Sequence, residues 1–161
     1  MRYQPSKSPV LQLWKKFGSS ALGRWAVSKG VAFKAPYFRS IRPRFVEVSP
    51  GRVEVVLKKR WGVTNHIGIV HAIAMCNAAE LAGGVCLDVS LDRRFRWIPV
   101  GMEVKYLKMA KTDLRAACEY PDFESIRAGD VVMPVGVFDR NGEEVFHADI
   151  TMRVSQRPSA E

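Results

Sequence analysis

The sequence contains few cysteines, and their spacing narrows the class of protein. Among 161 residues there are only three, Cys76, Cys86 and Cys118, and no two of them form a CxxC pair. This spacing argues against a zinc site, and we expect no bound metal. An odd number of cysteines, two of them in apolar segments, is typical of small core residues in a reducing compartment, so we expect a cytoplasmic protein.

Long hydrophobic runs are also missing. The strongly apolar stretches reach about ten residues before a polar group interrupts them, which is too short for a transmembrane helix. The N-terminus is basic but has neither the continuous apolar segment nor the cleavage site of a signal peptide. With 47% hydrophobic and 25% charged residues, we expect one globular domain without stable membrane insertion.

The net charge of +9 indicates what the surface attracts. It arises from 25 Lys and Arg against 16 Asp and Glu. Such a balance favours a polyanionic partner: nucleic acid, an anionic membrane surface or a phosphate-bearing molecule. The basic residues are spread along the chain, so an ordinary solvated surface is the alternative. Nucleic-acid binding would rest on charge alone, and we do not expect it.

Two amphipathic helices are predicted near the N-terminus. Ser8-Pro9 has the pattern of a helix start and Gly18 that of a helix stop, and a second helix is expected over about residues 21–32. The second has an apolar stripe flanked by Lys and Arg, a pattern that also occurs at membrane surfaces. Three aromatic residues are expected to pack on the sheet or a neighbouring subunit rather than on lipid: Trp14, Phe17 and Trp25.

Alternation with a period of two predicts antiparallel strands in most of the remaining chain. Two strands form a hairpin around Ser49-Pro50-Gly51, and Asn141-Gly142 is a strong signal for a second hairpin. The last four strands are expected to form a meander. The predicted strands cover residues 45–48, 52–58, 97–108, 114–120, 131–139 and 144–154.

One buried helix is predicted between the first hairpin and the later strands. Residues 69–82 are Ala-rich and almost wholly apolar. Gly83-Gly84 either ends this helix or marks a tight contact, and residues 85–91 would continue the helix or begin a strand. A sheet with one apolar face needs a cover, so the simplest architecture is an α+β domain whose curved sheet wraps around this helix. The chain is thus divided into a helical extension, a main domain and a tail: residues 1–40, 41–156 and 157–161.

Glu80 is the only carboxylate in this apolar helix. A buried carboxylate is costly without a partner, so Glu80 is a candidate general base; the alternative is an acid that reaches solvent or has a structural partner. His71 lies nine residues earlier, which places it on the opposite face of the helix and about 13.5 Å along its axis. If both serve one small substrate, two chains related by a two-fold axis must share the site.

The start of this helix offers polar groups of a different kind. The N–H groups near His71 and Ala72 lack intrahelical partners and carry the positive end of the helix dipole, so they are suited to stabilise an oxyanion. Asn65 lies six residues before His71 and has a side-chain amide that can orient a water molecule or a carbonyl group.

The pattern Asn65-x-x-Gly68-x-x-His71, followed by Glu80, resembles the hotdog-fold thioesterases of the phenylacetyl-CoA pathway type. Segments on either side, from Ala35-Pro36-Tyr37-Phe38 to the run 101–107, resemble a less characterised branch of that superfamily. The resemblance implies a hotdog fold, a homodimer or dimer of dimers, and catalysis by an acid that activates water or attacks the thioester.

The resemblance also assigns roles to particular residues. It implies that Asn65, His71 and Glu80 are catalytic and that Gly68 and Ala72 contact the substrate. Ala72 and Ile73 stand where those enzymes have two glycines. A backbone N–H survives this change, but the added side chains narrow the acyl pocket.

An acyl-CoA thioesterase is therefore the function that the sequence predicts. We expect no cofactor beyond the coenzyme A of an acyl-CoA or other acyl-thioester substrate, and basic side chains to contact its phosphates. A non-catalytic acyl- or acyl-CoA-binding protein is the alternative, which Ala72-Ile73 favours. A hotdog hydratase is a third possibility, but the pairing of Asn65 with Glu80 argues against it. The candidate phosphate contacts are Arg93, Arg94, Lys105 and Lys108.

Overall fold

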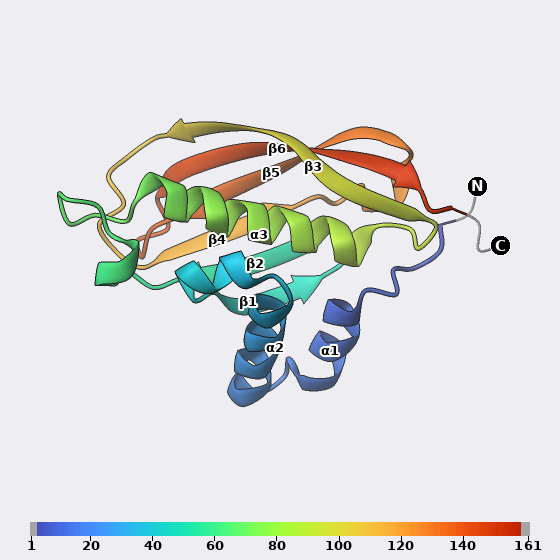
Figure 1. Ribbon diagram of the computed structural model, residues 1–161, viewed down its shortest axis with the longest axis horizontal. Coiled ribbons are helices and arrows are strands. Elements are labelled where there is room, and N and C mark those ends of the chain that lie inside the picture. The colour runs from blue at the N-terminus through green and yellow to red at the C-terminus, as the bar shows by residue number, and fades with distance from the viewer. Residues whose placement is uncertain (1–2, 159–161) are drawn as a thin grey trace.

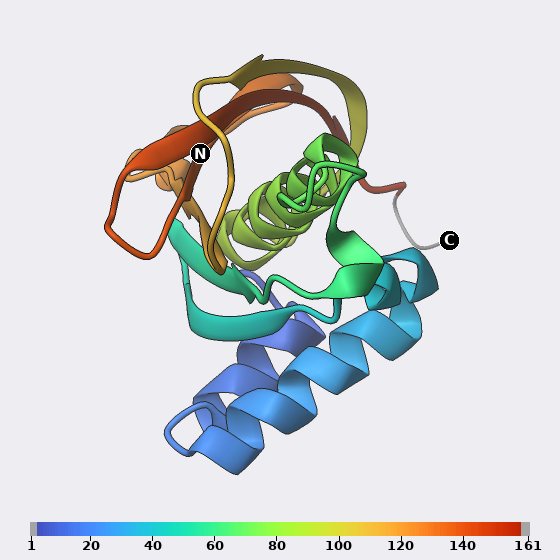
Figure 2. The ribbon, with the colours of Figure 1, turned by 90° about the vertical axis from the view of Figure 1, so that its left-hand side faces the viewer.

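The computed structural model describes residues 3–158, and a long helix lies at its centre. This helix, α3 (Ala72–Ser90), is enclosed by a curved six-stranded antiparallel sheet, as the end-on view in Figure 2 shows. The predicted α+β architecture, a curved sheet around one buried helix with helices ahead of it, is confirmed. The strands are β1 (Arg44–Ser49), β2 (Arg52–Leu57), β3 (Phe95–Tyr106), β4 (Leu114–Glu119), β5 (Gly129–Phe138) and β6 (Glu144–Gln156).

The strand order is β1-β2-β4-β5-β6-β3, which corrects the predicted four-strand meander. β3 does not pair with β4; it pairs along its length with β6, from Phe95↔Gln156 to Tyr106↔Phe146. β4 pairs instead with β2, over all six residues of each strand. In this order the β1–β2 hairpin is not left as a separate unit, because β4 joins it to the rest of the sheet. β3 becomes one edge of the sheet.

α3 begins later than predicted, and of the two alternatives stated for residues 85–91 the continued helix is the one observed. Residues 69–71 belong to the loop before the helix, because Val70 bridges to Thr64 and its N–H bonds the carbonyl of Ala110. Gly83 and Gly84 lie inside the helix, where they permit close contacts, so the helix continues through residues 85–90. A Cβ at Gly84 would lie 2.9 Å from the indole of Trp97.

The core lies between α3 and the concave face of the sheet. Phe45, Leu57, Phe146 and Ile150 are among its largest fully buried side chains. Cys86 and Cys118 are both buried, as predicted. The pKa of the Cys118 thiol is raised, because its contact with Cys86 and its burial both disfavour the thiolate.

α3 is also the one helix in residues 3–158 that is long and apolar enough to cross a membrane. Two-thirds of that apolar window, 67%, is buried inside the protein. The sheet therefore takes the place that lipid would occupy around a membrane-spanning helix, and the apolar character of α3 is that of a core helix.

The N-terminal helices lie outside the sheet. α1 (Pro9–Phe17) and α2 (Ala21–Lys34) project beside β1 in Figure 1, and a 3-10 helix, η1 (Pro36–Ile41), leads into β1. Trp14 packs against the core as expected, whereas Phe17 and Trp25 are 42% and 52% exposed and do not pack on this chain's sheet. Two short 3-10 helices, η2 (Trp61–Val63) and η3 (Phe123–Ser125), complete the fold. Residues 159–161 of the predicted tail lie outside the described residues.

Candidate active site

Glu80 lies at a hollow of about 370 Å³ between α3, the N-terminal helices and β3. Its carboxylate is half-buried, and most of the surrounding wall is apolar. The polar exceptions are Lys34 and Asp88. The helical extension therefore forms one side of the space in front of Glu80. The apolar wall consists of Val10, Val31, Ala35, Phe38, Leu81, Gly84, Val85, Trp97 and Pro99.

The face of α3 that the sheet leaves open carries both carboxylates of this helix. Cys76, Glu80, Gly84 and Asp88 are spaced four residues apart, so they follow one side of the helix. The pKa of the Cys76 thiol is raised, mainly by burial and also by the charge of Glu80 nearby. Both carboxylates of α3 thus lie on one face of the helix.

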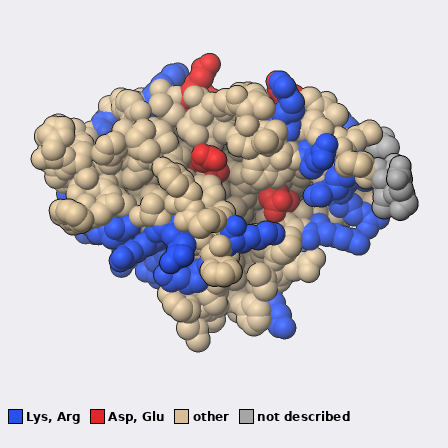
Figure 3. Space-filling model, in the orientation of Figure 1, with Lys and Arg blue, Asp and Glu red and all other residues tan. Residues whose placement is uncertain are grey.

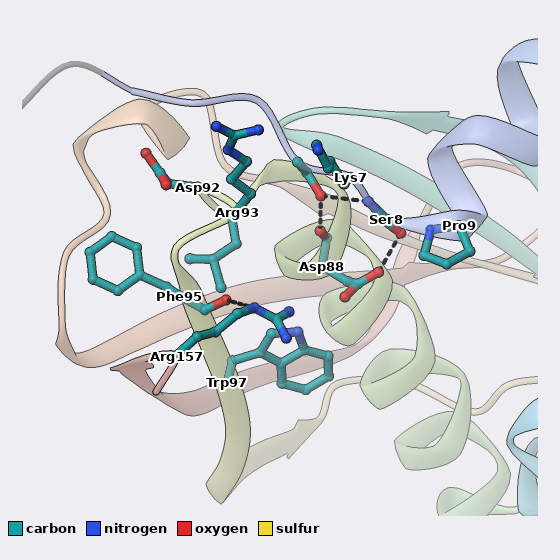
Figure 4. Close-up of a pocket in the computed structure, with 11 residues that line it drawn as sticks. Lys7, Ser8, Pro9, Asp88, Asp92, Arg93, Phe95, Trp97 and Arg157 are labelled. Carbon is teal, nitrogen blue, oxygen red and sulfur yellow. Dashed lines mark hydrogen bonds between the residues drawn. The ribbon is translucent and has the colours of Figure 1, made fainter. Parts of the chain in front are cut away.

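Asp88 has a structural partner at the other end of this face. The Oγ of Ser8, the N-cap residue of α1, donates to the Asp88 carboxylate, and the Oγ of Ser6 donates to the Asp88 carbonyl at 2.7 Å. Figure 4 shows the Ser8 contact at a second hollow of about 350 Å³, which Trp97 and Arg157 also line. Asp88 therefore fastens the start of α1 to α3, which distinguishes it from Glu80.

Asn65 organises the loop before α3. Its Oδ1 accepts the N–H groups of Ile67 and Ile69, each at 3.2 Å, and its carbonyl accepts the N–H of Gly68 at 3.0 Å. Gly68 has a φ of +75°, a conformation that glycine adopts without strain. The side-chain oxygen of Asn65 is thus committed to the loop. Its Nδ2 donates no hydrogen bond within residues 3–158, so this group is the one that can face a substrate.

His71 is the N-cap of α3, and this position determines what its ring can do. Its Nδ1 accepts the N–H of Ile73 at 3.1 Å, which leaves the proton of a neutral ring on Nε2. The N–H of Ile73 is therefore already used, and the predicted donor at His71 is used too, because its N–H bonds the carbonyl of Val63 at 2.8 Å. The N–H of Ala72 makes no hydrogen bond in the described part of the chain, so it remains the available donor at the helix start.

The three predicted catalytic residues line three separate hollows in one chain. Asn65, Ala72 and Lys108 share a hollow of about 360 Å³, where Tyr106 also lies. His71 lines a different hollow of about 190 Å³. Glu80 belongs to neither of these. A single chain therefore brings Asn65 and Ala72 together but keeps them apart from Glu80, in agreement with the opposite helix faces of His71 and Glu80.

The four predicted phosphate contacts differ in whether their basic side chains already have partners within the protein. Arg94 is used structurally: its guanidinium bonds both oxygens of the buried Asp92, and the pKa of that carboxyl is held well below its usual range. Arg93 bonds the side chain of Gln4 at 2.5 Å. Lys108 forms an exposed ion pair with Glu143, and Lys105 is exposed on β3. Of the four, Lys108 alone lines the hollow of Asn65 and Ala72.

Sequence reasoning missed two residues at the hollow of Glu80. Asp88 lies two turns after Glu80, and this spacing could have placed it on the same helix face. Trp97 comes from β3, and its position follows from the pairing of β3 with β6, for which the sequence carries no local signal. Among residues 3–158, no group of three or more His, Cys, Asp or Glu side chains is placed to hold a metal ion.

A curved antiparallel sheet around one long buried helix defines the hotdog fold, and the resemblance to hotdog-fold thioesterases is confirmed. Residues 23–154 match the family described as a domain of unknown function, DUF4442, and the chain belongs to that family.

Solved structures support this placement. A structural-genomics protein designated APC5556 is 43% identical, with a TM-score of 0.83 over 93% of this chain and 100% of that chain. PA5026 from Pseudomonas aeruginosa, described as a probable thioesterase, is 26% identical, with a TM-score of 0.72 over 78% and 91% of the two chains. A thioesterase family protein from Silicibacter pomeroyi shares the fold at 17% identity, with a TM-score of 0.69 over 83% and 99%. No curated protein matches the chain.

Proposed function

We propose that the protein is an acyl-CoA thioesterase, a thioester hydrolase in which Glu80 is the general base. The observation that carries this proposal is the carboxylate of Glu80 at the edge of an apolar hollow of about 370 Å³. That volume is within the range of small-molecule sites, and an apolar wall suits an acyl chain. The description of PA5026 as a probable thioesterase supports the same reaction.

The proposed site is completed by a second copy of the chain. The two edges of the sheet differ, because α2 packs against β1 whereas β3 carries exposed apolar side chains: Ile98, Val100 and Tyr106 are 61%, 47% and 59% exposed. A long, apolar, unpaired edge is suited to pair with another strand. Two such edges would bring the α3 helices of two chains side by side in opposite directions.

The spacing on α3 is compatible with this arrangement. Ala72 and Glu80 are eight residues, or about 12 Å, apart along the helix. A two-fold axis passing near Cys76, halfway between them, would place Glu80 of each chain beside Ala72 and Asn65 of the other. Each dimer would then contain two equivalent sites.

In the proposed reaction, Glu80 accepts a proton from water as the water oxygen bonds the thioester carbon. The Ala72 N–H and the Asn65 Nδ2 stabilise the oxygen that becomes negative, as the helix dipole also does. The carbon–sulfur bond then breaks, and the leaving thiolate takes the proton from Glu80. The proposed role of His71 is to hold the helix start through Ile73. The proposed reaction requires no cofactor other than the coenzyme A of the substrate.

The coenzyme A phosphates are proposed to meet cations near the mouth of the site. Lys108 supports this best, because it shares the hollow of Asn65 and Ala72. Lys105 on β3 and Arg93 after α3 are the other exposed candidates. We place the reaction in the cytoplasm.

A non-catalytic acyl-CoA-binding protein is the second candidate function. It is favoured by the helix start, where the N–H of Ile73 is bonded to His71 and Ala72-Ile73 replaces two glycines. The site then keeps one free amide donor instead of two, which reduces the stabilisation of an oxyanion.

The decisive experiment measures hydrolysis and binding of acyl-CoA on the same variants. Glu80→Gln keeps the shape of the side chain but removes its basicity, so kcat should fall by about 10²–10⁴-fold while binding changes little. Glu124→Gln, the same substitution at an exposed site, is the matched control and should keep kcat. Hydrolysis that survives Glu80→Gln within about threefold would exclude Glu80 as the base, because a general base contributes far more.

Asn65→Ala tests the other half of the proposed site. We expect a loss of about 10–10³-fold in kcat if its amide contacts the reacting oxygen. Sedimentation tests the two-chain arrangement, because an active 18.1 kDa monomer at assay concentration would rule it out. Acyl-CoA binding without any hydrolysis by the wild type would establish the binding protein instead.

A further inference from the structure

The positive charge of the protein comes from its N-terminal part. Residues 1–46 contain ten Lys and Arg and no Asp or Glu, whereas the remaining residues contain 15 basic and 16 acidic side chains. The net charge of +9 is thus +10 from the first part and −1 from the rest, although basic residues occur along the whole chain. Within residues 3–46 none of these cations forms an ion pair with a carboxylate.

The outer face of α2 is apolar as well as cationic. Leu22, Trp25, Lys29 and Phe33 follow one another at intervals of three or four residues, so they form a stripe along one side of the helix. Leu22 is 73% exposed and Phe33 81%, while the opposite side of α2 is buried. The Lys29 ammonium lies 5.9 Å from the Trp25 ring. The stripe therefore faces solvent and is not part of the core.

A cationic hollow lies next to this stripe. It has a volume of about 1000 Å³ and is formed by α2, η1 and the segment before β1. Lys29, Arg39 and Arg42 line it together with Phe33, and no carboxylate of residues 3–158 does. In Figure 3 the projecting lower part of the molecule, which is α1 and α2 in Figure 1, is mostly uncharged, and Lys and Arg lie above it. Apolar tips bordered by cations are typical of proteins that lie on a membrane surface.

We propose that the face formed by α2 and η1 docks on an anionic lipid membrane surface. Its exposed apolar stripe, Leu22, Trp25 and Phe33, enters the interface between headgroups and acyl chains. Its cationic hollow, lined by Lys29, Arg39 and Arg42, binds lipid phosphates. This is reversible attachment to the surface and does not insert a helix across the bilayer.

The cations beside the apolar stripe favour an anionic lipid surface over the other partners that an apolar face could bind. A second copy would bring the same unpaired cations together, and the rest of the chain has a net charge of only −1 to offer them. Nucleic acid would satisfy the cations, but it gives no reason for aliphatic Leu22 to be 73% exposed in the stripe. An anionic bilayer matches both the apolar stripe and the cationic hollow.

The test is flotation of the full chain with vesicles at physiological salt. We expect binding to vesicles with 30% phosphatidylglycerol in phosphatidylcholine and at least tenfold weaker binding to phosphatidylcholine alone, since several cations contribute. The triple variant Lys29→Gln, Arg39→Gln, Arg42→Asn should weaken binding about 100-fold, because each cation contributes about fivefold. Asn is chosen because Arg42 has a φ of +50°. Phe33→Ser should weaken binding about tenfold.

A matched control separates this site from net charge in general. Lys111→Gln, Arg127→Gln and Arg140→Gln remove the same charge from exposed positions on loops of the sheet, and binding should stay within about threefold. Failure to bind anionic vesicles would overturn the proposal. So would equal weakening by the two triple variants, unchanged vesicle binding in Phe33→Ser, or self-association that Phe33→Ser abolishes. Tighter binding to single-stranded RNA than to vesicles would assign the face to nucleic acid. Binding is measured without substrate, so the result does not depend on hydrolysis.

Discussion

The two faces of α3 differ sharply although they belong to one apolar helix. On the side toward the sheet, Ala78, Ala82 and Val89 are completely buried. On the opposite side, Glu80 and Asp88 are only half-buried and border hollows. The sheet encloses the first face, whereas the second is bordered by the helical extension and β3. On such a helix, the positions of the carboxylates therefore show which side the sheet leaves open.

The largest loss of stability is expected when a larger side chain is placed on the closed face of α3, the face that packs against the sheet. Ala82→Leu adds three carbon atoms where no space is left, so the free energy of unfolding should fall by about 3 kcal/mol. Cys76→Leu on the open face is the comparison, because Cys76 is half-buried, and its loss should be below about 1 kcal/mol. Urea unfolding of both variants measures the difference. Equal losses would contradict the distinction between the two faces.

Substitution of Asp92, just after α3, should have the next largest effect on the free energy of unfolding. Besides Arg94, its carboxylate accepts the N–H of Gln4 at 2.7 Å, and its side chain is 3% exposed. Asp92→Asn should lower the free energy of unfolding by about 2 kcal/mol at neutral pH.

The pH dependence of this loss has a definite sign. Because the pKa of Asp92 is depressed in the folded protein, its stabilisation is complete above the usual carboxyl pKa of about 4 and declines as the pH falls below it. The difference between wild type and Asp92→Asn should therefore shrink between pH 5 and pH 3, as measured by urea unfolding. A difference that stays constant or grows in acid would disprove this assignment.

Substituting alanine for either of two adjacent glycines, Gly83 and Gly84, should have the smallest effect on stability. Because they are neighbours in one helix, they also compare the two faces most directly. A Cβ at Gly83 would lie 3.2 Å from both Ile150 and Val135 in the buried sheet. At Gly84 it would lie closer, 2.9 Å, to the outer edge of one partly exposed side chain, Trp97, which solvent leaves more room to shift. Alanine favours a helix over glycine by about 1 kcal/mol at either position. Crowding should outweigh this gain in Gly83→Ala, for a net loss of about 1 kcal/mol. Gly84→Ala should be neutral or slightly stabilising, and thermal unfolding would show the reverse order if the faces were equivalent.

Much of the fold could be predicted because its signals are local. Alternating residues locate the strands, and the Ala-rich segment identifies the buried helix. The pairing of β3 with β6 could not be predicted, because it depends on contacts between distant segments. The extension of α3 beyond Gly83 depends in the same way on how closely Trp97 and Ile150 approach the helix.

For the candidate site, the sequence identified the residues but not all of their contacts. The spacing of Asn65, His71 and Glu80 identified them as candidates and predicted that His71 and Glu80 lie apart in one chain. In the structure these residues line separate hollows. It could not show that the ring of His71 already accepts a backbone N–H, because capping geometry depends on the path of the loop. Whether these residues act together stays a prediction.

The position of β3 beside β6 also determines the order in which the fold can be completed. Paired residues of these strands are separated by 40 positions at one end, Tyr106 and Phe146, and by 61 at the other, Phe95 and Gln156. During synthesis, β3 leaves the ribosome long before its partner exists, with apolar side chains and an unsatisfied backbone. Closing such long loops costs more chain entropy than closing a hairpin, so we expect the pairing of β3 with β6 to form late in folding. Until β6 arrives, the apolar side chains and unpaired backbone of β3 are open to contact with other chains and with chaperones.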